Sequence, residues 1–367
     1  MKCHFVYSVP ATGYGRRLRR RVFLGLQRFG SRLCWFGDRH NPDMRLWPRR
    51  SPYENTRHIF LGLSRRVPAV LYALDEQVRC DFSAADIFLG HPRFPAEGGK
   101  MGVTELSIDQ TPRPRIFALI SPLHCDTSIG TTHINKAYLD AVDRLLPRAD
   151  VLFAIMGEYW WDQWPNSPYA HWMDKMVRLD MAIDTTYFPR VKRRFNPPGK
   201  RGFLYIGRND PMKGTDFLSK LAHHTHDCRW GWIGSGSEID GIPRLSGPRP
   251  LTPDYLSQLA EEFDFFINTS VADPNPTTIL ESMAWGFPVI CTAQSGYYET
   301  SYRRNIYLAD LERSIGVLRE LQTVDEASLH GMADEARRVV DDYYMWDRFT
   351  GCICSRLGLT SQRCGTE

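Results

Sequence analysis

The chain has 367 residues, 43% of them apolar, which is more than one hydrophobic core usually serves and favours two domains. Nine cysteines with no C-x-x-C pair are typical of reduced thiols rather than of a disulfide framework. The first residues are too short and too mixed for a signal peptide, and no apolar run approaches the ~20 residues of a membrane span. We therefore expect a cytoplasmic protein.

Charge is unevenly spread along the chain. Residues 1–50 hold twelve Lys or Arg against Asp38 and Asp43, a net charge of +10, although the whole chain carries only +4. A helix that ends near Phe29 carries four of these charges on its exposed face, at Arg17, Arg20, Arg21 and Arg28. This face is either an ordinary solvated helix surface or a contact with an anionic membrane on the inner side of the cell.

The first half alternates between strand and helix patterns. A strand over 3–9 leads through Gly13 and Gly15 into the basic helix and then into a strand over 32–36, so the chain opens with a βαβ unit. The glycine turn is not a complete dinucleotide fingerprint. Later strands are expected at 67–74, 87–89, 115–120 and 150–155, with a helix at 135–147 between the last two.

Two segments of this half hold candidate ligand-binding side chains. His124 follows the strand over 115–120, at the end of a strand where open α/β sheets bind ligands. Residues 158–172 contain four tryptophans and two tyrosines, which fit buried helix packing better than sugar stacking or a lipid interface.

The second half begins after a linker that contains Pro197, Pro198 and Gly199. A buried strand over 202–206 is followed by Gly207, Arg208, Lys213 and a helix over 215–223. A strand over 230–233 then runs into Gly234, and a helix is expected at 252–262.

Residues 264–292 read as strand, loop, helix and strand. The apolar runs at 265–267 and 288–291 predict buried parallel strands, and Thr277 or Thr278 is the expected cap of the helix between them. Asp273 lies in the loop and Glu281 lies about one turn into the helix, so both carboxylates should face the ligand crevice. Further helices are expected at 310–321, 325–343 and 346–358.

These segments resemble retaining glycosyltransferases of the GT-B fold, family 4 type (glycosyl transferases group 1). The family's acidic signature has two acids separated by seven residues, the spacing of Asp273 and Glu281, followed by Ala284-Trp285-Gly286-Phe287-Pro288. Its basic loop matches 207–214, and Ser295 to Glu299 resemble a further family turn. The first acid is Asp where the family has Glu, and Pro274 and Pro276 remove two backbone donors.

The resemblance implies a fold of two Rossmann-like α/β/α domains facing a central cleft. Residues 1–190 would form the acceptor-binding domain, residues 200–345 the nucleotide-sugar-binding domain, and residues 346–358 a helix that crosses back to the first domain. The implied activity is retaining, metal-independent transfer of a hexose from a nucleotide-diphosphate sugar to a glycan or lipid-linked acceptor in the synthesis of cell-surface polysaccharide. It involves no other cofactor and no nucleic acid.

The same resemblance assigns roles to the candidate residues. Arg208 and Lys213 would neutralise the leaving diphosphate, Asp273 would hold sugar hydroxyls, and His124 would lie near the transferred sugar. Four glycines and one acid, by contrast, would line the nucleotide sites: Gly13, Gly15, Gly207, Gly234 and Glu281. The chain has no Asp-x-Asp tripeptide of the kind that holds a metal in the other common glycosyltransferase fold.

Other interpretations remain open at this stage. Arg208 and Lys213 could form surface ion pairs, and Glu281 could be a charge on a helix surface. A nucleotide-sugar epimerase or a non-catalytic binding protein would share the same fold.

Overall fold

The structure is a computed structural model that describes residues 1–7, 53–74, 79–92, 102–108, 112–128, 136–248 and 251–359. Gly13, Gly15 and the strand expected over 32–36 lie outside these residues. So does the basic helix with Arg17, Arg20, Arg21 and Arg28.

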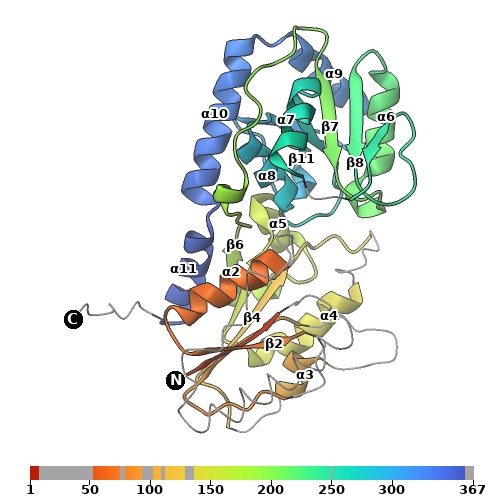
Figure 1. The fold of residues 1–367 in the computed structure, drawn as a ribbon. Helices are drawn as coiled ribbons and strands as arrows, with labels where there is room; N and C mark the ends of the chain where they lie inside the picture. The colour runs from red at the N-terminus through yellow and green to blue at the C-terminus, as the bar shows by residue number, and fades with distance from the viewer. Residues whose placement is uncertain are drawn as a thin grey trace, which may run out of the picture. The chain divides into compact units, whose positions relative to one another are not determined.

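Six parallel strands form a first sheet in the order β2-β1-β3-β4-β5-β6 (Figure 1). The strands are β1 (Cys3–Tyr7), β2 (Ala69–Ala73), β3 (Ile87–Gly90), β4 (Ile116–Pro122), β5 (Val151–Ile155) and β6 (Met176–Leu179). The helices of this half are α2 (Tyr53–Ser64), α3 (Val103–Ser107), α4 (Lys136–Leu145) and α5 (Gly157–Gln163). β1 and β5 are buried along their whole lengths because a parallel sheet covered by helices exposes neither face.

A second sheet has the order β12-β11-β10-β7-β8-β9 and is also parallel. Its strands are β7 (Gly202–Ile206), β8 (Arg229–Ile233), β9 (Arg244–Ser246), β10 (Phe265–Asn268), β11 (Val289–Thr292) and β12 (Arg303–Ile306). The helices around it are α6 (Thr215–His224), α7 (Pro253–Glu262), α8 (Thr277–Trp285), α9 (Leu311–Thr323) and α10 (Glu326–Tyr343).

Alternate residues of the second sheet enter different cores. Phe203 and Tyr205 of β7 lie in one apolar cluster with Leu218 of α6 and Leu318 of α9. Leu204, between them, is equally buried but does not belong to that cluster. Because side chains alternate across a strand, helices on both faces are needed to bury the whole strand.

Two compact units divide the chain. One comprises Met1–Ser121, Asp140–Phe153 and Thr350–Glu367, and the other comprises Pro122–Leu139 and Ala154–Phe349. The last helix, α11 (Trp346–Arg356), therefore ends in the unit of the amino terminus. There Thr350 lies so close to Gly62 of α2 that a Cβ atom on this glycine would be 2.6 Å from that of Thr350. The carboxyl end of α11 thus packs within the first unit.

Most predicted elements appear within a few residues of their expected bounds, but two expectations need correction and several elements were missed. No threonine caps α8, because Thr277 is its first residue and Pro276 occupies the cap position. Five elements were not predicted: α2, α3, β6, β9 and β12. The segment 158–172 is only partly α-helical, since α5 ends at Gln163 and 3-10 turns follow, although Trp160, Trp164 and Trp172 are buried as expected.

A buried carboxylate ties the linker to the second sheet. Asp264, fully buried before β10, accepts hydrogen bonds from Lys192 Nζ at 2.8 Å and from the Asn196 backbone N–H at 2.8 Å. It also accepts from Asn196 Nδ2 at 2.9 Å and from the Gly202 N–H, the first of β7, at 3.0 Å. Burial lowers the pKa of Lys192, and the charge of Asp264 opposes that shift. One side chain thus fixes the linker and two strands.

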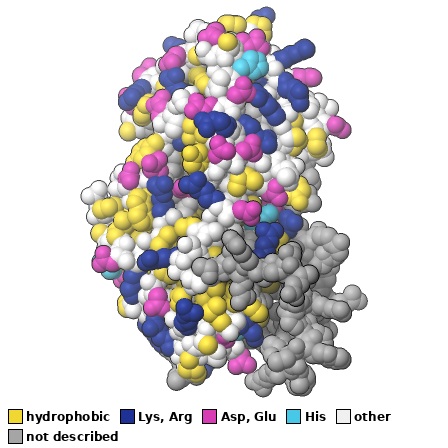
Figure 2. All heavy atoms as spheres, turned by 90° about the vertical axis from the view of Figure 1, so that its left-hand side faces the viewer, with side chains coloured by type: hydrophobic (Ala, Val, Ile, Leu, Met, Phe, Trp, Pro, Cys, Tyr) yellow, Lys and Arg dark blue, Asp and Glu magenta, His cyan; other side chains and the backbone are white. Residues whose placement is uncertain are grey.

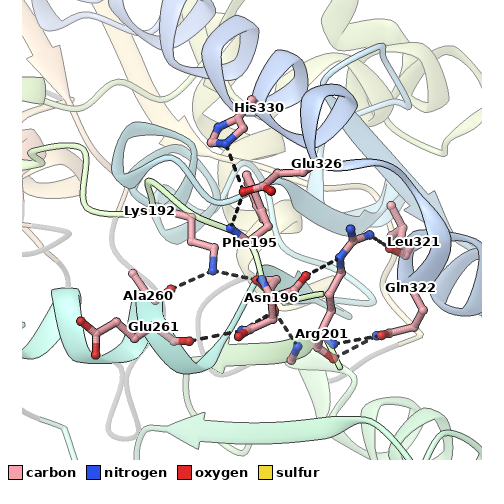
Figure 3. Close-up of polar contacts among 12 residues, drawn as sticks. Lys192, Phe195, Asn196, Arg201, Ala260, Glu261, Leu321, Gln322, Glu326 and His330 are labelled. Atoms are coloured by element: carbon pink, nitrogen blue, oxygen red, sulfur yellow. Dashed lines mark hydrogen bonds and ion pairs between the residues drawn. The ribbon is translucent and has the colours of Figure 1, made fainter. Parts of the chain in front are cut away.

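A second buried cation continues this network. Arg201 donates to the Leu321 carbonyl at 2.6 Å and to the Asn196 carbonyl at 3.2 Å, while its own backbone exchanges hydrogen bonds with the Gln322 side chain (Figure 3). Glu326 accepts from the Phe195 N–H at 3.3 Å. The end of α9 and the start of α10 are thereby tied to the linker.

The outer surface is charged without large areas of one sign on the face shown in Figure 2. Along α10, Arg337 pairs with Asp341 at 2.8 Å and Arg338 pairs with Asp342 at 3.5 Å, both at helical i,i+4 spacing. Within the described part of the chain, no helix has the length and apolar content needed to cross a membrane.

We predict that Asp264→Ala lowers the free energy of unfolding by about 3–5 kcal/mol, because it leaves the Lys192 ammonium buried without its partner. Urea unfolding followed by circular dichroism measures the effect. The matched control is Glu262→Ala, which removes an exposed partner of Arg229 at 3.3 Å and should cost at most about 1 kcal/mol. Equal costs for the two variants would contradict the structural role of the buried carboxylate.

Candidate functional site

The loop after β7 brings Lys213 to the carboxyl edge of the second sheet. The Asp210 side chain accepts a hydrogen bond from the Met212 N–H at 3.0 Å and starts a 3-10 turn over Pro211–Lys213. Gly214 follows with φ of 63°, and a Cβ atom there would lie 2.1 Å from the Thr269 carbonyl oxygen. Only glycine combines this left-handed backbone with this close approach.

The loop after β10 carries Asp273 and packs on the Lys213 turn. The Thr269 hydroxyl donates to the Lys213 carbonyl at 2.9 Å, and the Val271 N–H donates to the Met212 carbonyl at 3.0 Å. Lys213 Nζ forms an ion pair with Asp273 Oδ2, and the two side chains are only 17% and 11% exposed. The structure therefore joins the predicted basic loop to the predicted first acid of the acidic signature.

Arg208 lies in the same β7 loop but is not part of this pair. Its side chain is 47% exposed and faces Asp210, with Nη2 to Oδ2 at 3.6 Å. Tyr205 holds the backbone by donating its hydroxyl to the Arg208 carbonyl at 2.8 Å. The guanidinium is thus available to a ligand at this edge, although a surface ion pair with Asp210 describes its present contact.

Gly207 and Gly234 approach each other too closely for a side chain to fit at Gly234. A Cβ atom on Gly234 would lie 1.7 Å from the Gly207 carbonyl oxygen, which accepts a hydrogen bond from Trp232 Nε1 at 2.9 Å. The two predicted nucleotide-loop glycines therefore let the loops after β7 and β8 meet.

Two helices begin at this edge without a side-chain cap. α6 begins two residues after Lys213, α8 begins four residues after Asp273, and neither has a capping hydrogen bond from a side chain. Glu281 lies on α8 one turn from its start and is partly buried. Uncapped helix starts offer backbone N–H groups and the positive end of the helix dipole to an anion.

His124 is buried in the loop after β4. Neither ring nitrogen makes a hydrogen bond of ordinary geometry among the described residues, and the ring lies 5.4 Å from that of Trp160. Burial lowers the pKa of His124 to about 4, and the charges of Asp126 and Asp273 oppose that shift. The imidazole is therefore neutral near pH 7, with two unsatisfied polar atoms close to the acidic loop.

A junction of three loops positions the Asp273 segment, and its central residue was not predicted from the sequence. Asn275 has φ of 67°, the only positive φ of a non-glycine residue in the described chain. Its N–H donates to the Ser295 carbonyl at 3.1 Å, and its side-chain oxygen accepts from the Met181 N–H. Asparagine tolerates the left-handed region better than most residues. An asparagine between Pro274 and Pro276 was therefore the sequence signal that could have predicted this turn.

Gly157 and Gly296 complete this junction. A Cβ atom on Gly157 would lie 2.4 Å from the Gly296 carbonyl oxygen and 2.5 Å from Asn275 Nδ2. Asp273 is held from the same side, because its N–H donates to the Gln294 carbonyl at 3.2 Å. The acid thus stands on a backbone that neighbouring loops fix from several directions.

This arrangement combines a cation that can leave its partner, a second exposed cation and two uncapped helix starts. It can bind a polyanion such as a diphosphate and can place a carboxylate beside it. In the part of the chain that the structure describes, no group of three or more His, Cys, Asp or Glu side chains could hold a metal ion.

No family model matches the sequence, and no curated protein matches it. Solved structures do match the fold. Sucrose-phosphate synthase from Thermosynechococcus elongatus is similar with a TM-score of 0.56 and 13% identity, over 74% of this chain and 73% of that one. The trehalose-6-phosphate structure from E. coli bound with UDP-2-fluoro glucose gives a TM-score of 0.53 and 14% identity, over 75% and 74% of the two chains.

TarM is similar with a TM-score of 0.55 and 12% identity, over 75% of this chain but only 54% of its own length. At such identities the likeness concerns the fold alone. The two parallel six-stranded sheets with their helices form the GT-B fold, which confirms the predicted fold class.

We predict that Gly157→Ala disturbs the junction beneath Asp273 and lowers the free energy of unfolding by more than Gly199→Ala. Both glycines have left-handed backbones, with φ of 70° and 77°, so both variants carry a cost of about 1–2 kcal/mol. Only Gly157 lacks room, since no atom lies within 4 Å of a Cβ on Gly199. Overpacking should therefore add about 1–3 kcal/mol in Gly157→Ala, measured by urea unfolding. Similar losses of unfolding free energy in both variants would show that the junction accommodates the extra methyl group without cost.

We also predict that His124 makes stability depend on pH. Because its pKa falls from 6.5 to about 4 on folding, the unfolded chain binds more protons in this window, and stability is lost as the pH falls. Between pH 7 and 4.5 the loss should be about 2–3 kcal/mol. His124→Asn should remove that loss, whereas His91, whose pKa is also lowered by burial, contributes equally in both proteins. Parallel curves of unfolding free energy against pH would contradict this account.

Proposed function

We propose that this protein is a retaining glycosyltransferase of the family 4 type that moves a sugar from a nucleotide-diphosphate donor to a glycan or lipid-linked acceptor. The observation that carries the proposal is the Lys213–Asp273 pair, placed between two uncapped helix starts at the carboxyl edge of the second GT-B sheet. Open α/β sheets bind ligands at this edge. The nucleotide-sugar analogue bound to the E. coli neighbour supports a donor of that class.

The reaction breaks the bond between the anomeric carbon and a diphosphate oxygen, and the electron pair leaves with the diphosphate. Lys213 and Arg208 would stabilise this growing negative charge, with help from the N–H groups at the start of α6. Fixed donors aimed at such charge contribute about 3–4 kcal/mol each to the transition state. The acceptor hydroxyl oxygen forms the new bond on the face that the diphosphate leaves, and its proton passes to the departing diphosphate.

Asp273 would change partners when the donor binds. A diphosphate competes with Asp273 for the Lys213 ammonium, and once Lys213 turns to the phosphate the carboxylate is free to accept hydrogen bonds from sugar hydroxyls. Glu281, on α8, would accept from the two ribose hydroxyls, because one carboxylate offers acceptors to two neighbouring donors. His124 is neutral and unsatisfied, so it would bind the transferred sugar by hydrogen bonds rather than by charge.

Other parts of the proposal extend from the sequence. Lys213 and Arg208 would replace the charge of a metal ion, so transfer would be metal-independent. The arginine-rich segment of residues 1–50 would hold a cytoplasmic protein against an anionic membrane that carries the acceptor. This second idea depends on residues that the structure does not describe, and its support is the net charge of the segment.

We predict that Lys213→Ala and Arg208→Ala each lower kcat/KM for transfer by about a hundredfold or more, because each removes a donor to the leaving diphosphate. The assay measures release of nucleoside diphosphate with the donor found by a thermal-shift screen of UDP, GDP, ADP and dTDP sugars, repeated in EDTA. Lys220→Ala, on α6 and outside the β7 loop, is the matched control and should keep the wild-type rate.

Three outcomes would reject parts of the proposal. Wild-type rates in both folded variants would reject the diphosphate role. Loss of activity in EDTA that Mg²⁺ restores would reject metal independence. A new epimer of the donor, formed without an acceptor, would favour the epimerase instead.

A further inference from the structure

A pocket of about 510 Å³ opens within the second compact unit, and its lining includes Val271 of the loop that carries Asp273. Its lining comes from α5 and the turn after it, from the loop that follows His124, and from the loops after β10, β11 and β12. This volume lies within the roughly 300–1,000 Å³ range of small-molecule pockets.

The pocket contains an aromatic ring in a fixed orientation. Tyr159 is half-buried, and its ring meets that of Trp160 at 5.0 Å and 81° and that of Tyr298 at 5.8 Å and 70°. Trp160 is itself fixed, since its Nε1–H donates to the Gln294 carbonyl at 2.9 Å. These edge-to-face contacts with two neighbouring rings hold the tyrosine ring in one orientation.

The polar lining consists of neutral groups and one acid. Gln163 and Asn166 present carboxamides, Ser167 presents a hydroxyl, and Asp126 presents a carboxylate. Among the described residues that line the pocket, none is Lys or Arg. A phosphate or a carboxylate here would meet the Asp126 charge with no cation to balance it, whereas sugar hydroxyls could both donate to Asp126 and pair with the carboxamides.

The pocket wall shares backbone with the proposed reaction centre. The Gln294 carbonyl accepts from Trp160 Nε1 and also from the Asp273 N–H at 3.2 Å. Val271, also in the lining, is hydrogen-bonded to Met212, the residue before Lys213. Gln294 and Val271 therefore connect the pocket to both members of the ion pair, each through one backbone hydrogen bond.

We propose that this pocket binds a neutral sugar residue of the acceptor, with its apolar face on Tyr159 and its hydroxyls on Gln163, Asn166 and Asp126. The inference rests on the proposed glycosyl transfer and adds the class of acceptor to it. The donor's diphosphate would bind Lys213 and Arg208, and its sugar would bind Asp273 and His124. None of these four residues lines the pocket, so we assign the pocket to the other substrate. Acceptor sugars that carry phosphate or carboxylate at this position are rejected by Asp126.

Saturation-transfer NMR tests binding without requiring catalysis. The probes are the methyl glycosides of glucose, galactose, mannose and N-acetylglucosamine, compared with glucose 6-phosphate and methyl glucuronide. Each is added to the full-length protein saturated with UDP, GDP, ADP or dTDP, whichever the thermal-shift screen identifies. At least one neutral glycoside should give a signal, and the two anionic probes should give none. Tyr159→Ala should weaken the neutral signal about tenfold, Tyr159→Phe should retain it, and Gln163→Ala should weaken it as well.

Controls separate this inference from loss of structure and from the proposed reaction. Tyr343→Ala removes an exposed tyrosine of α10 and should leave binding unchanged. Each variant must keep the wild-type melting temperature and its shift with the nucleotide. The pocket assignment is overturned if no neutral glycoside binds, if an anionic probe binds better, or if Tyr159→Ala binds like the wild type. Binding that behaves as expected without any sugar transfer would reject the proposed reaction and keep the pocket.

Discussion

The site depends on one buried carboxylate at the opposite edge of the sheet. Asp264 receives four hydrogen bonds, from Lys192, from the backbone and side chain of Asn196 and from Gly202. Burying this charge is favourable only while all its partners are present, because desolvation otherwise outweighs the attraction. The start of β7 and the start of β10 are therefore fixed to each other. Since β7 and β10 are parallel neighbours, their far ends are aligned too, and the loops with Lys213 and Asp273 meet.

The sequence predicted the elements better than it predicted their contacts. The strands β7 and β10 were found because their apolar runs are continuous, as burial on both faces requires. β12 was missed because its sequence begins with Arg303 and Arg304, whose charges hide a buried strand. The Lys213–Asp273 pair joins residues 60 positions apart, and only the strand order β10-β7 makes them neighbours. No local pattern carries that information, so the sequence could propose both residues but not their pairing.

If Lys213 binds a diphosphate as proposed, the ion pair also explains how the site remains stable before the diphosphate binds. A lone cation at 17% exposure would be costly, and so would a lone carboxylate at 11%. Each neutralises the other until a ligand offers the lysine a stronger partner. A diphosphate carries more charge than one carboxylate, so the exchange is favourable, and it releases Asp273 when sugar hydroxyls are present to receive it. Arg208 needs no such partner because it is nearly half exposed.

Strained backbone and shared carbonyls make the region around Asp273 stiff. Asn275 is held in the left-handed region by contacts to Ser295 and Met181, and a residue stays in this conformation only where its surroundings determine it. The Gln294 carbonyl binds both Asp273 and Trp160, so the acid and the aromatic pocket cannot move independently without breaking a hydrogen bond. A sugar that fits against Tyr159 is then placed at a fixed distance from the acid. In the proposed transfer between two bound substrates, such placement would supply the required proximity, and it would arise from backbone geometry rather than from any single reactive side chain.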